Sequence, residues 1–138
     1  MTRDDFLAAA RGMLDTPFRH QGRLPGIGLD CGGLAICALQ QCGYPVTDPR
    51  GYGRLPAKGM LEQALLDHCD RIALADLLPG DLMAFAFRTE SQHIAIVTSL
   101  APVMLLHAYA DVGKVVENGC DATWQNRLRG CWRLRGIE

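Results

Sequence analysis

The order of the hydrophobic patterns along the 138 residues is the strongest constraint on the fold. Apolar residues recur at helical spacing in the first half of the chain, and short β-rich apolar runs begin only after the turn at Pro79-Gly80. Helices first and strands afterwards are typical of an α+β fold with an antiparallel sheet, because a parallel sheet requires the two to alternate. A chain of this length is expected to form a single domain over residues 1–138.

The boundaries of these elements follow from periodicity and from capping residues. Helices are predicted over residues 3–14, 30–43 and 58–69, and strands over 81–87, 93–98, 103–109, 112–117 and 130–135. Residues 15–30 and 44–57 contain Gly and Pro and are predicted to be irregular loops. We therefore expect N-terminal helices packed on an antiparallel sheet of about five strands.

Charge and hydropathy exclude several classes of protein. A formal net charge of −1 gives no reason to expect a nucleic-acid partner, and no stretch approaches the roughly 18 apolar residues of a membrane-inserted helix. Asp4 and Asp5 stand where a signal peptide would carry basic residues, so we expect synthesis in the cytoplasm without a signal peptide. Four arginines between residues 127 and 135 predict a solvated basic edge in preference to a polyanion site.

Six cysteines are present, and free thiols are the expectation for a chain without export signals. Cys31 differs from the other five because it follows Asp30, a residue type that caps helix N-termini, at the start of the second predicted helix. Backbone N–H groups and the helix dipole at that position are expected to stabilise a thiolate. The same groups are suited to bind an oxyanion.

Two histidines lie in the predicted hairpin that follows. If the hairpin turns around residues 100 and 101, His93 and His107 are opposite each other on one face, with Cβ atoms about 5 Å apart. With Cys31 they would supply a nucleophile, a base and a group that orients the base. Two other readings stay open: a metal site formed by the same three side chains, and two core histidines bonded to backbone carbonyls.

Five segments, in chain order, resemble the motifs of the NlpC-type cell-wall cysteine peptidases, in particular their phage-tail branch. They extend over about 100 residues and are Asp15–Gly22, Gly28–Leu34 around Cys31, Leu78–Leu82, His93–Val97 and His107-Ala108. The resemblance implies a minimal papain-like fold and a triad of Cys31, His93 and His107. It also implies hydrolysis of the γ-D-glutamyl to diamino-acid bond in peptidoglycan stem peptides, without a cofactor or metal.

The same resemblance implies a substrate-binding role for the residues around the nucleophile. Asp30 would hold the amino end of the stem peptide. Phe18 stands where the family has a tyrosine near the oxyanion site, and Gly32 stands where it has a serine. Either His20 or Gln21 replaces the missing hydroxyl donor, or the backbone N–H groups suffice without it.

Departures from the family pattern keep two alternative functions open: an acyltransferase or amidase that uses the same Cys-His site, and a catalytically inactive tail-assembly homologue. A phage-tail or other delivery protein would be the partner that brings the chain to the cell wall, where it would act after delivery or as a virion component.

Overall fold

The computed structural model describes residues 1–49, 51–54, 56 and 59–138. In these ranges the chain forms an α+β fold with a six-stranded antiparallel sheet, in the order β3-β8-β4-β5-β6-β7, and a two-stranded ribbon, β1-β2. The predicted fold class is confirmed, and the main sheet has six strands instead of about five.

The element boundaries are close to those that periodicity predicts. The α-helices are α1 (Arg3–Arg11), α2 (Cys31–Gln41), α3 (Met60–His68) and α4 (Ala122–Arg127), and one 3-10 helix spans Leu74–Asp76. The strands are β1 (Arg23–Leu24), β2 (Gly28–Leu29), β3 (Cys69–Ile72), β4 (Leu82–Phe85), β5 (His93–Leu100), β6 (Val103–Tyr109), β7 (Lys114–Gly119) and β8 (Leu128–Leu134).

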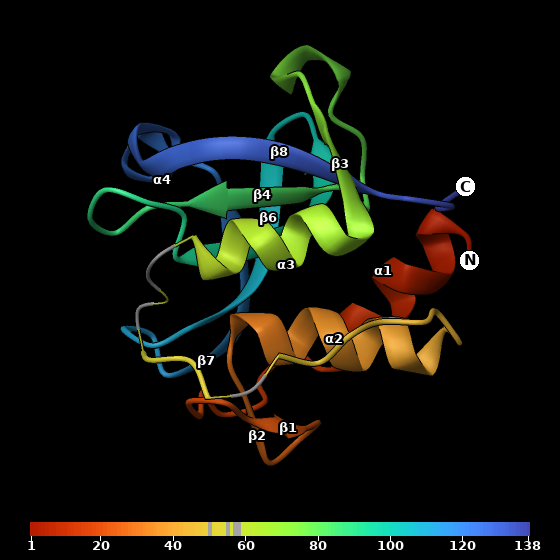
Figure 1. Cartoon of the computed structure of the whole chain (residues 1–138), viewed down its shortest axis with the longest axis vertical. Coiled ribbons are helices and arrows are strands. Elements are labelled where there is room, and N and C mark those ends of the chain that lie inside the picture. Colours follow the sequence, from red (N-terminus) through yellow and green to blue (C-terminus); the bar gives the residue numbers. More distant parts are fainter. Residues whose placement is uncertain (50, 55, 57–58) are drawn as a thin grey trace.

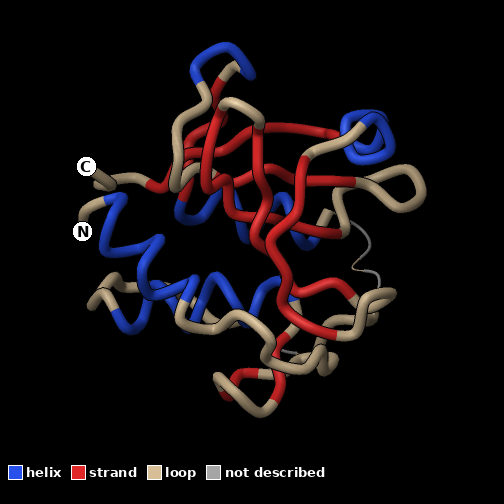
Figure 2. Tube along the Cα trace, turned by 180° about the vertical axis from the view of Figure 1, so that it is seen from behind, coloured by secondary structure: helices blue, strands red, loops and turns tan. Residues whose placement is uncertain are grey.

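One face of the large sheet is covered by α1 and α2, which lie side by side below it in Figure 1 and are seen from behind in Figure 2. The shared core contains Phe6 of α1, Leu34 of α2, and Leu82 and Ile96 of the sheet. Burial of such side chains contributes about 1.5–3 kcal/mol each, so this layer supplies much of the driving force for folding.

The other face of the sheet carries a second apolar cluster. Because side chains alternate along a strand, the neighbours of the first core point the opposite way. Met83, Phe85 and Val97 pack there with Trp124 of α4. The sheet is therefore buried on both faces, which explains why every residue of β4 and the first six residues of β5 are buried.

Short elements are where the sequence prediction falls short. The ribbon β1-β2, strand β3 and helix α4 were not predicted, and α1 ends three residues early because Gly12 caps it. Strand β3 has four residues and pairs with β8, far away in the sequence, so no local pattern marks it. The predicted loop 44–57 and helix 58–69 include residues 50, 55, 57 and 58, which lie outside the described residues.

Asp81 joins the two ends of the chain. Its carboxylate has no exposed surface and accepts hydrogen bonds from Arg3 at 2.9 Å and from Arg133 at 2.8 and 3.0 Å. The nearby Arg135 donates to the carbonyl oxygens of Leu66 and Asp67 at the end of α3. These two C-terminal arginines therefore have structural partners, and Arg135 and Arg129 are also exposed, as the predicted solvated basic edge requires.

Within the described ranges, no helix combines the length and the apolar composition that a bilayer crossing requires.

Replacement of Asp81 tests this linkage. Burial by itself would raise the pKa of Asp81, but hydrogen bonds from Arg133, Arg3 and the Leu78 backbone N–H lower it below 3.8. We expect Asp81→Asn to lower the free energy of unfolding by about 2–3 kcal/mol at pH 7, because two guanidinium groups lose their partner but stay partly hydrated.

Because the folded-state pKa is lowered, the stabilisation is present above the unfolded-state pKa and is lost as pH falls through the folded-state value. Urea unfolding at pH 7 and pH 3 should show the difference between wild type and variant shrink in acid. Asp70→Asn is the matched control, since Asp70 pairs with Arg135 at 3.2 Å on the surface and should change stability by less than about 1 kcal/mol. Equal effects of the two substitutions would contradict the prediction.

Candidate active site

His93 and His107 lie on adjacent strands, but not in the predicted register. Strands β5 and β6 pair Ile96 with Leu106, so His107 stands opposite Ala95 instead of opposite His93. The turn falls later than predicted, so that Leu100 pairs with Val103, which alone would shift the register by three residues. An irregularity between Val97 and Ser99 takes back one residue, so the prediction is wrong by two residues at the histidines. A two-residue shift preserves the face of each side chain, so the predicted shared face is confirmed and the ring centroids lie 5.0 Å apart.

A chain of hydrogen bonds fixes the proton positions on the two rings. The amide nitrogen of Asn118 donates to the Gly119 carbonyl at 3.1 Å, which turns its Oδ1 toward His107 Nε2 at 2.7 Å. His107 Nε2 must therefore donate, and its Nδ1 accepts from His93 Nε2 at 2.7 Å. This arrangement leaves the lone pair of neutral His93 on Nδ1, on the side of the ring away from His107.

Aromatic rings enclose the histidine pair. Phe87, Trp124 and Tyr109 lie 5.3, 5.6 and 5.8 Å from the His93 ring centroid, and Tyr109 also stacks on His107. Burial, followed by the influence of His107 and Arg127, lowers the pKa of His93 well below its usual 6.5. Burial also lowers the pKa of His107, against the hydrogen bond with Asn118. Both rings are therefore neutral near pH 7.

Cys31 is the first residue of α2, as the sequence predicts. Asp30 caps the helix by accepting from the Gly33 backbone N–H at 2.7 Å. Backbone N–H groups of Gly32 and Ile94 donate to the sulfur, so the predicted amide environment is present. Burial and the Asp30 charge nevertheless raise the pKa of Cys31 to about 12, which favours the neutral thiol in the free site over the expected thiolate.

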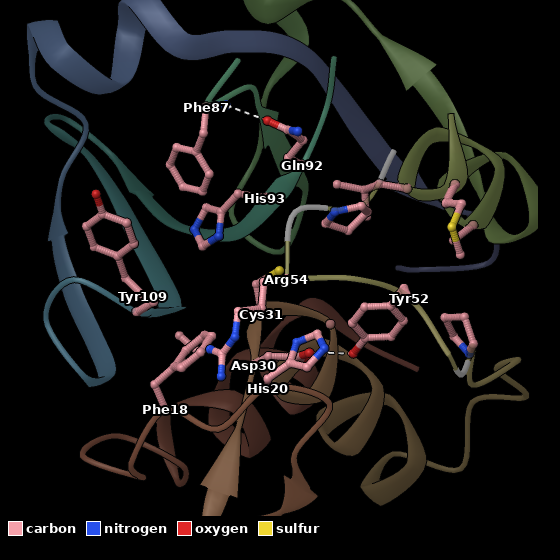
Figure 3. A pocket seen from close by; sticks show the side chains of 18 of the residues that line it. Phe18, His20, Asp30, Cys31, Tyr52, Arg54, Phe87, Gln92, His93 and Tyr109 are labelled. Carbon is pink, nitrogen blue, oxygen red and sulfur yellow. Dashed lines mark hydrogen bonds between the residues drawn. The ribbon is translucent and has the colours of Figure 1, made fainter. Parts of the chain in front are cut away.

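A cavity of about 440 Å³ opens where the N-terminus of α2 meets the start of β5 and the end of β6. Figure 3 shows Cys31 and His93 on facing sides of it. The other predicted site residues that line it are Phe18, His20, Asp30 and Gly32. The structure therefore brings together the predicted nucleophile, the predicted base and four of the five residues expected at the substrate site.

Two predicted residues do not line the cavity. His107 is fully buried behind His93, as an orienting residue would be. Gln21 turns its side chain away and donates to the Tyr52 carbonyl at 2.8 Å. Of the two candidates for the missing hydroxyl donor at Phe18, only His20 faces the cavity.

The carboxylate of Asp30 is fully engaged by the protein itself. Oδ1 accepts from the Gly33 N–H and from Arg23 Nη1 at 2.9 Å, and Oδ2 accepts from the Gln21 N–H at 2.9 Å and from the Tyr52 hydroxyl. A carboxylate has about four lone-pair sites, and all four are used here. The expected contact between Asp30 and a substrate amine has no free acceptor in this arrangement.

Close approach of the backbone makes this network possible. A Cβ at Gly33 would lie 2.1 Å from the Gly22 carbonyl oxygen, and one at Gly22 would lie 2.5 Å from the Gly28 oxygen. Only glycine therefore allows the loop before β1 to lie against the first turn of α2 and to bring Arg23 to Asp30.

Four residues at the site were not predicted from the sequence: Asn118, Arg23, Tyr52 and Arg54, the last three of which line the cavity. Asn118 lies on β7, two residues beyond Val116, the partner of His107 in the sheet. Side chains alternate along a strand, so Asn118 is on the same face of β7 as Val116. This alternation could have identified Asn118 as a polar neighbour of His107 from the sequence. Tyr52 and Arg54 approach the site only in three dimensions, and no sequence signal marks them.

No group of three or more His, Cys, Asp or Glu side chains in the described part of the chain is arranged to hold a metal ion.

Residues 15–133 match the model of the NlpC/P60 family. The chain belongs to the NlpC/P60 family. The match includes the segments around Cys31, His93 and His107. No curated protein matches the chain.

Solved NlpC/P60 structures share the fold. A lipoprotein-like family member from Staphylococcus aureus superposes with a TM-score of 0.74 at 20% identity, over 96% of this chain and 41% of that one. The peptidoglycan hydrolase RipB of Mycobacterium tuberculosis superposes with a TM-score of 0.73 at 16% identity, over 99% of this chain and 65% of RipB. RipD of the same organism is a non-catalytic domain adapted to peptidoglycan binding. It superposes with a TM-score of 0.67 at 16% identity, over 97% of this chain and 96% of RipD.

This NlpC/P60 chain is shorter than several of the proteins it resembles. It spans 41% of the S. aureus protein and 40% of a Bacillus cereus family member. At these identities the superpositions show the fold, and they include one hydrolase and one non-catalytic domain.

The pH dependence of alkylation tests the state of Cys31. Because its thiol pKa is raised to about 12, the thiolate fraction grows about tenfold per pH unit below that value. We expect the rate of Cys31 alkylation by iodoacetamide, followed by peptide mass spectrometry, to rise continuously from pH 6 to pH 10. A rate that is flat over this range would show a preformed thiolate and contradict the prediction. Partly exposed Cys42 provides an internal comparison in the same samples.

Proposed function

We propose that this chain is a cysteine peptidase that hydrolyses amide bonds in peptidoglycan stem peptides, at the γ-D-glutamyl to diamino-acid linkage. One observation carries the proposal: the sulfur at the N-terminus of α2 and the His93–His107–Asn118 chain meet in one cavity. Family membership supports the substrate class, since solved relatives include a peptidoglycan hydrolase.

In the first half of the reaction, the Cys31 thiol attacks the amide carbonyl as its proton passes to His93 Nδ1. A neutral thiol and a neutral imidazole are the starting state, so His93 acts as a general base during attack. The oxyanion forms beside the first turn of α2, where backbone N–H groups can stabilise it, with His20 on the same cavity wall. The imidazolium then protonates the leaving amine, and a thioester to Cys31 remains.

In the second half, neutral His93 takes a proton from water, which attacks the thioester carbonyl. Collapse of the tetrahedral intermediate returns the proton to the sulfur and releases the free acid. His107 holds His93 throughout by accepting its Nε2–H, and Asn118 holds His107 in the tautomer that makes this possible.

The proposal treats residues 1–138 as one NlpC-type domain that reaches the wall through another protein. The phage-tail partner and the virion location stay predictions from the sequence resemblance. The rival outcomes are transfer of the acyl group to an amine and peptidoglycan binding without cleavage, the latter being the property of RipD.

Digestion of purified muropeptides, read by mass spectrometry, tests the function. Wild type should release fragments cleaved after the γ-glutamyl carbonyl. Cys31→Ala and His93→Ala should each lower the rate by at least about a thousandfold, because they remove the nucleophile and the base.

Cys42→Ala, which changes a thiol outside the cavity, should cleave like wild type. Identical fragments from wild type and Cys31→Ala would show that Cys31 is not the nucleophile. Products joined to an added amine, in place of the free acid, would identify an acyltransferase.

Asn118→Ala tests the positioning of the histidine pair. Loss of the Oδ1 acceptor frees His107 to adopt the other tautomer, so we expect kcat to fall about tenfold or more with little change in KM. Asn118→Asp keeps an acceptor toward His107 Nε2 and should retain more of kcat than the alanine variant. A larger effect on KM than on kcat would place Asn118 in substrate binding and contradict a positioning role.

A further inference from the structure

The described lining of the cavity carries five charged side chains, and four of them have partners within the protein. Asp30 and Arg23 are joined at 2.9 Å. Arg23 also donates from Nε to Asp48 at 2.9 Å and from Nη2 to the Tyr52 hydroxyl at 2.8 Å. Neither member of this pair has a free group for a ligand.

The second engaged pair lies on the opposite wall. The Arg127 guanidinium lies over the rings of Phe87 and Trp124, at 5.3 and 5.0 Å from their centroids, and its Nη1 lies 3.4 Å from the Tyr109 hydroxyl. That hydroxyl in turn donates to Asp111 at 2.9 Å. The positive and negative charges on this wall are therefore linked through Tyr109.

Arg54 is the exception. Its side chain is exposed, it lines the cavity, and it makes no hydrogen bond or ion pair with another described residue. Figure 3 draws Arg54 among the side chains that line the cavity, together with Cys31 and Phe18. A free guanidinium in the same cavity as the proposed nucleophile presents a planar pair of donors that matches a carboxylate.

Two residues before Arg54 are bonded to the first turn of α2 and the loop beside it, which brings the Arg54 backbone to the cavity. Asp48 is bonded to Arg23, the Tyr52 hydroxyl donates to Asp30, and the Tyr52 carbonyl accepts from Gln21. These bonds hold Asp48 and Tyr52 against the N-terminus of α2, and Arg54 lies two residues beyond Tyr52.

We propose that Arg54 is a specificity residue that binds a substrate carboxylate next to the scissile carbonyl. The inference rests on the proposed function: in a γ-D-glutamyl amide, the glutamate that carries the attacked carbonyl also carries a free α-carboxylate. Substrate recognition then depends on this α-carboxylate. It does not depend on a contact between a substrate amine and Asp30, because the Asp30 carboxylate has no free acceptor site. Peptides in which the α-carboxylate is converted to an amide are poor substrates.

Two synthetic tripeptides test this, L-alanyl-γ-D-glutamyl-diamino acid and its analogue with an α-carboxamide on the glutamate. Wild type should cleave the carboxylate form with a kcat/KM about ten- to a hundredfold higher than the amide form, as expected for a charge-assisted bidentate contact. Arg54→Gln should bring the ratio close to one, mainly by slowing cleavage of the carboxylate form. Arg54→Lys, which keeps the charge but not the fork, should give an intermediate ratio.

Arg129→Gln is the matched control, because Arg129 is exposed on β8 outside the cavity, and its ratio should equal that of wild type. Cleavage of both peptides at equal rates by wild type, or an unchanged ratio in Arg54→Gln, overturns the role of Arg54 and leaves the proposed function standing.

If wild type cleaves neither peptide, the proposed function fails, and binding of the same two peptides measured by calorimetry decides the inference separately. A preference for the carboxylate form that Arg54→Gln abolishes supports it, and equal affinities overturn it.

Discussion

The carboxylate of Asp30 is the interaction on which the site depends. It caps α2 through the Gly33 N–H, and it accepts from the Gln21 N–H, from Arg23 and from Tyr52. One side chain thus joins the helix that presents Cys31, the loop before β1 and Tyr52. Four donors compensate its desolvation, which explains how a charged group can be 95% buried beside a nucleophile, with 5% of its surface exposed.

That carboxylate also has an electrostatic consequence for catalysis. With burial, its charge raises the pKa of Cys31, while burial, His107 and Arg127 lower the pKa of His93. Both effects favour a neutral thiol beside a neutral imidazole over an ion pair. In the proposed mechanism the proton therefore moves during attack, and the amides of Gly32 and Ile94 would stabilise the negative charge that develops on sulfur.

The sheet fixes the orientation of His93, the proposed base. Three adjacent strands, β5, β6 and β7, each supply one member of the His93–His107–Asn118 chain. Because antiparallel strands are held by their backbone bonds, the three side chains are fixed relative to one another without a flexible loop. The enclosing rings, Trp124 above all, exclude water from the two imidazoles and strengthen their bonds.

Local pattern alone determined the α+β class, the start of α2 at Asp30-Cys31 and the pairing of two histidines on one face, since capping and alternation are properties of neighbouring residues. Tertiary structure decided the rest. The register of β5 and β6 depends on where the turn falls, the partners of Asp30 arrive from residues up to 22 positions away, and Asn118 and Arg54 reach the site from other segments. Such contacts, and the burial that sets the pKa of Cys31, arise only when distant parts of the chain pack together.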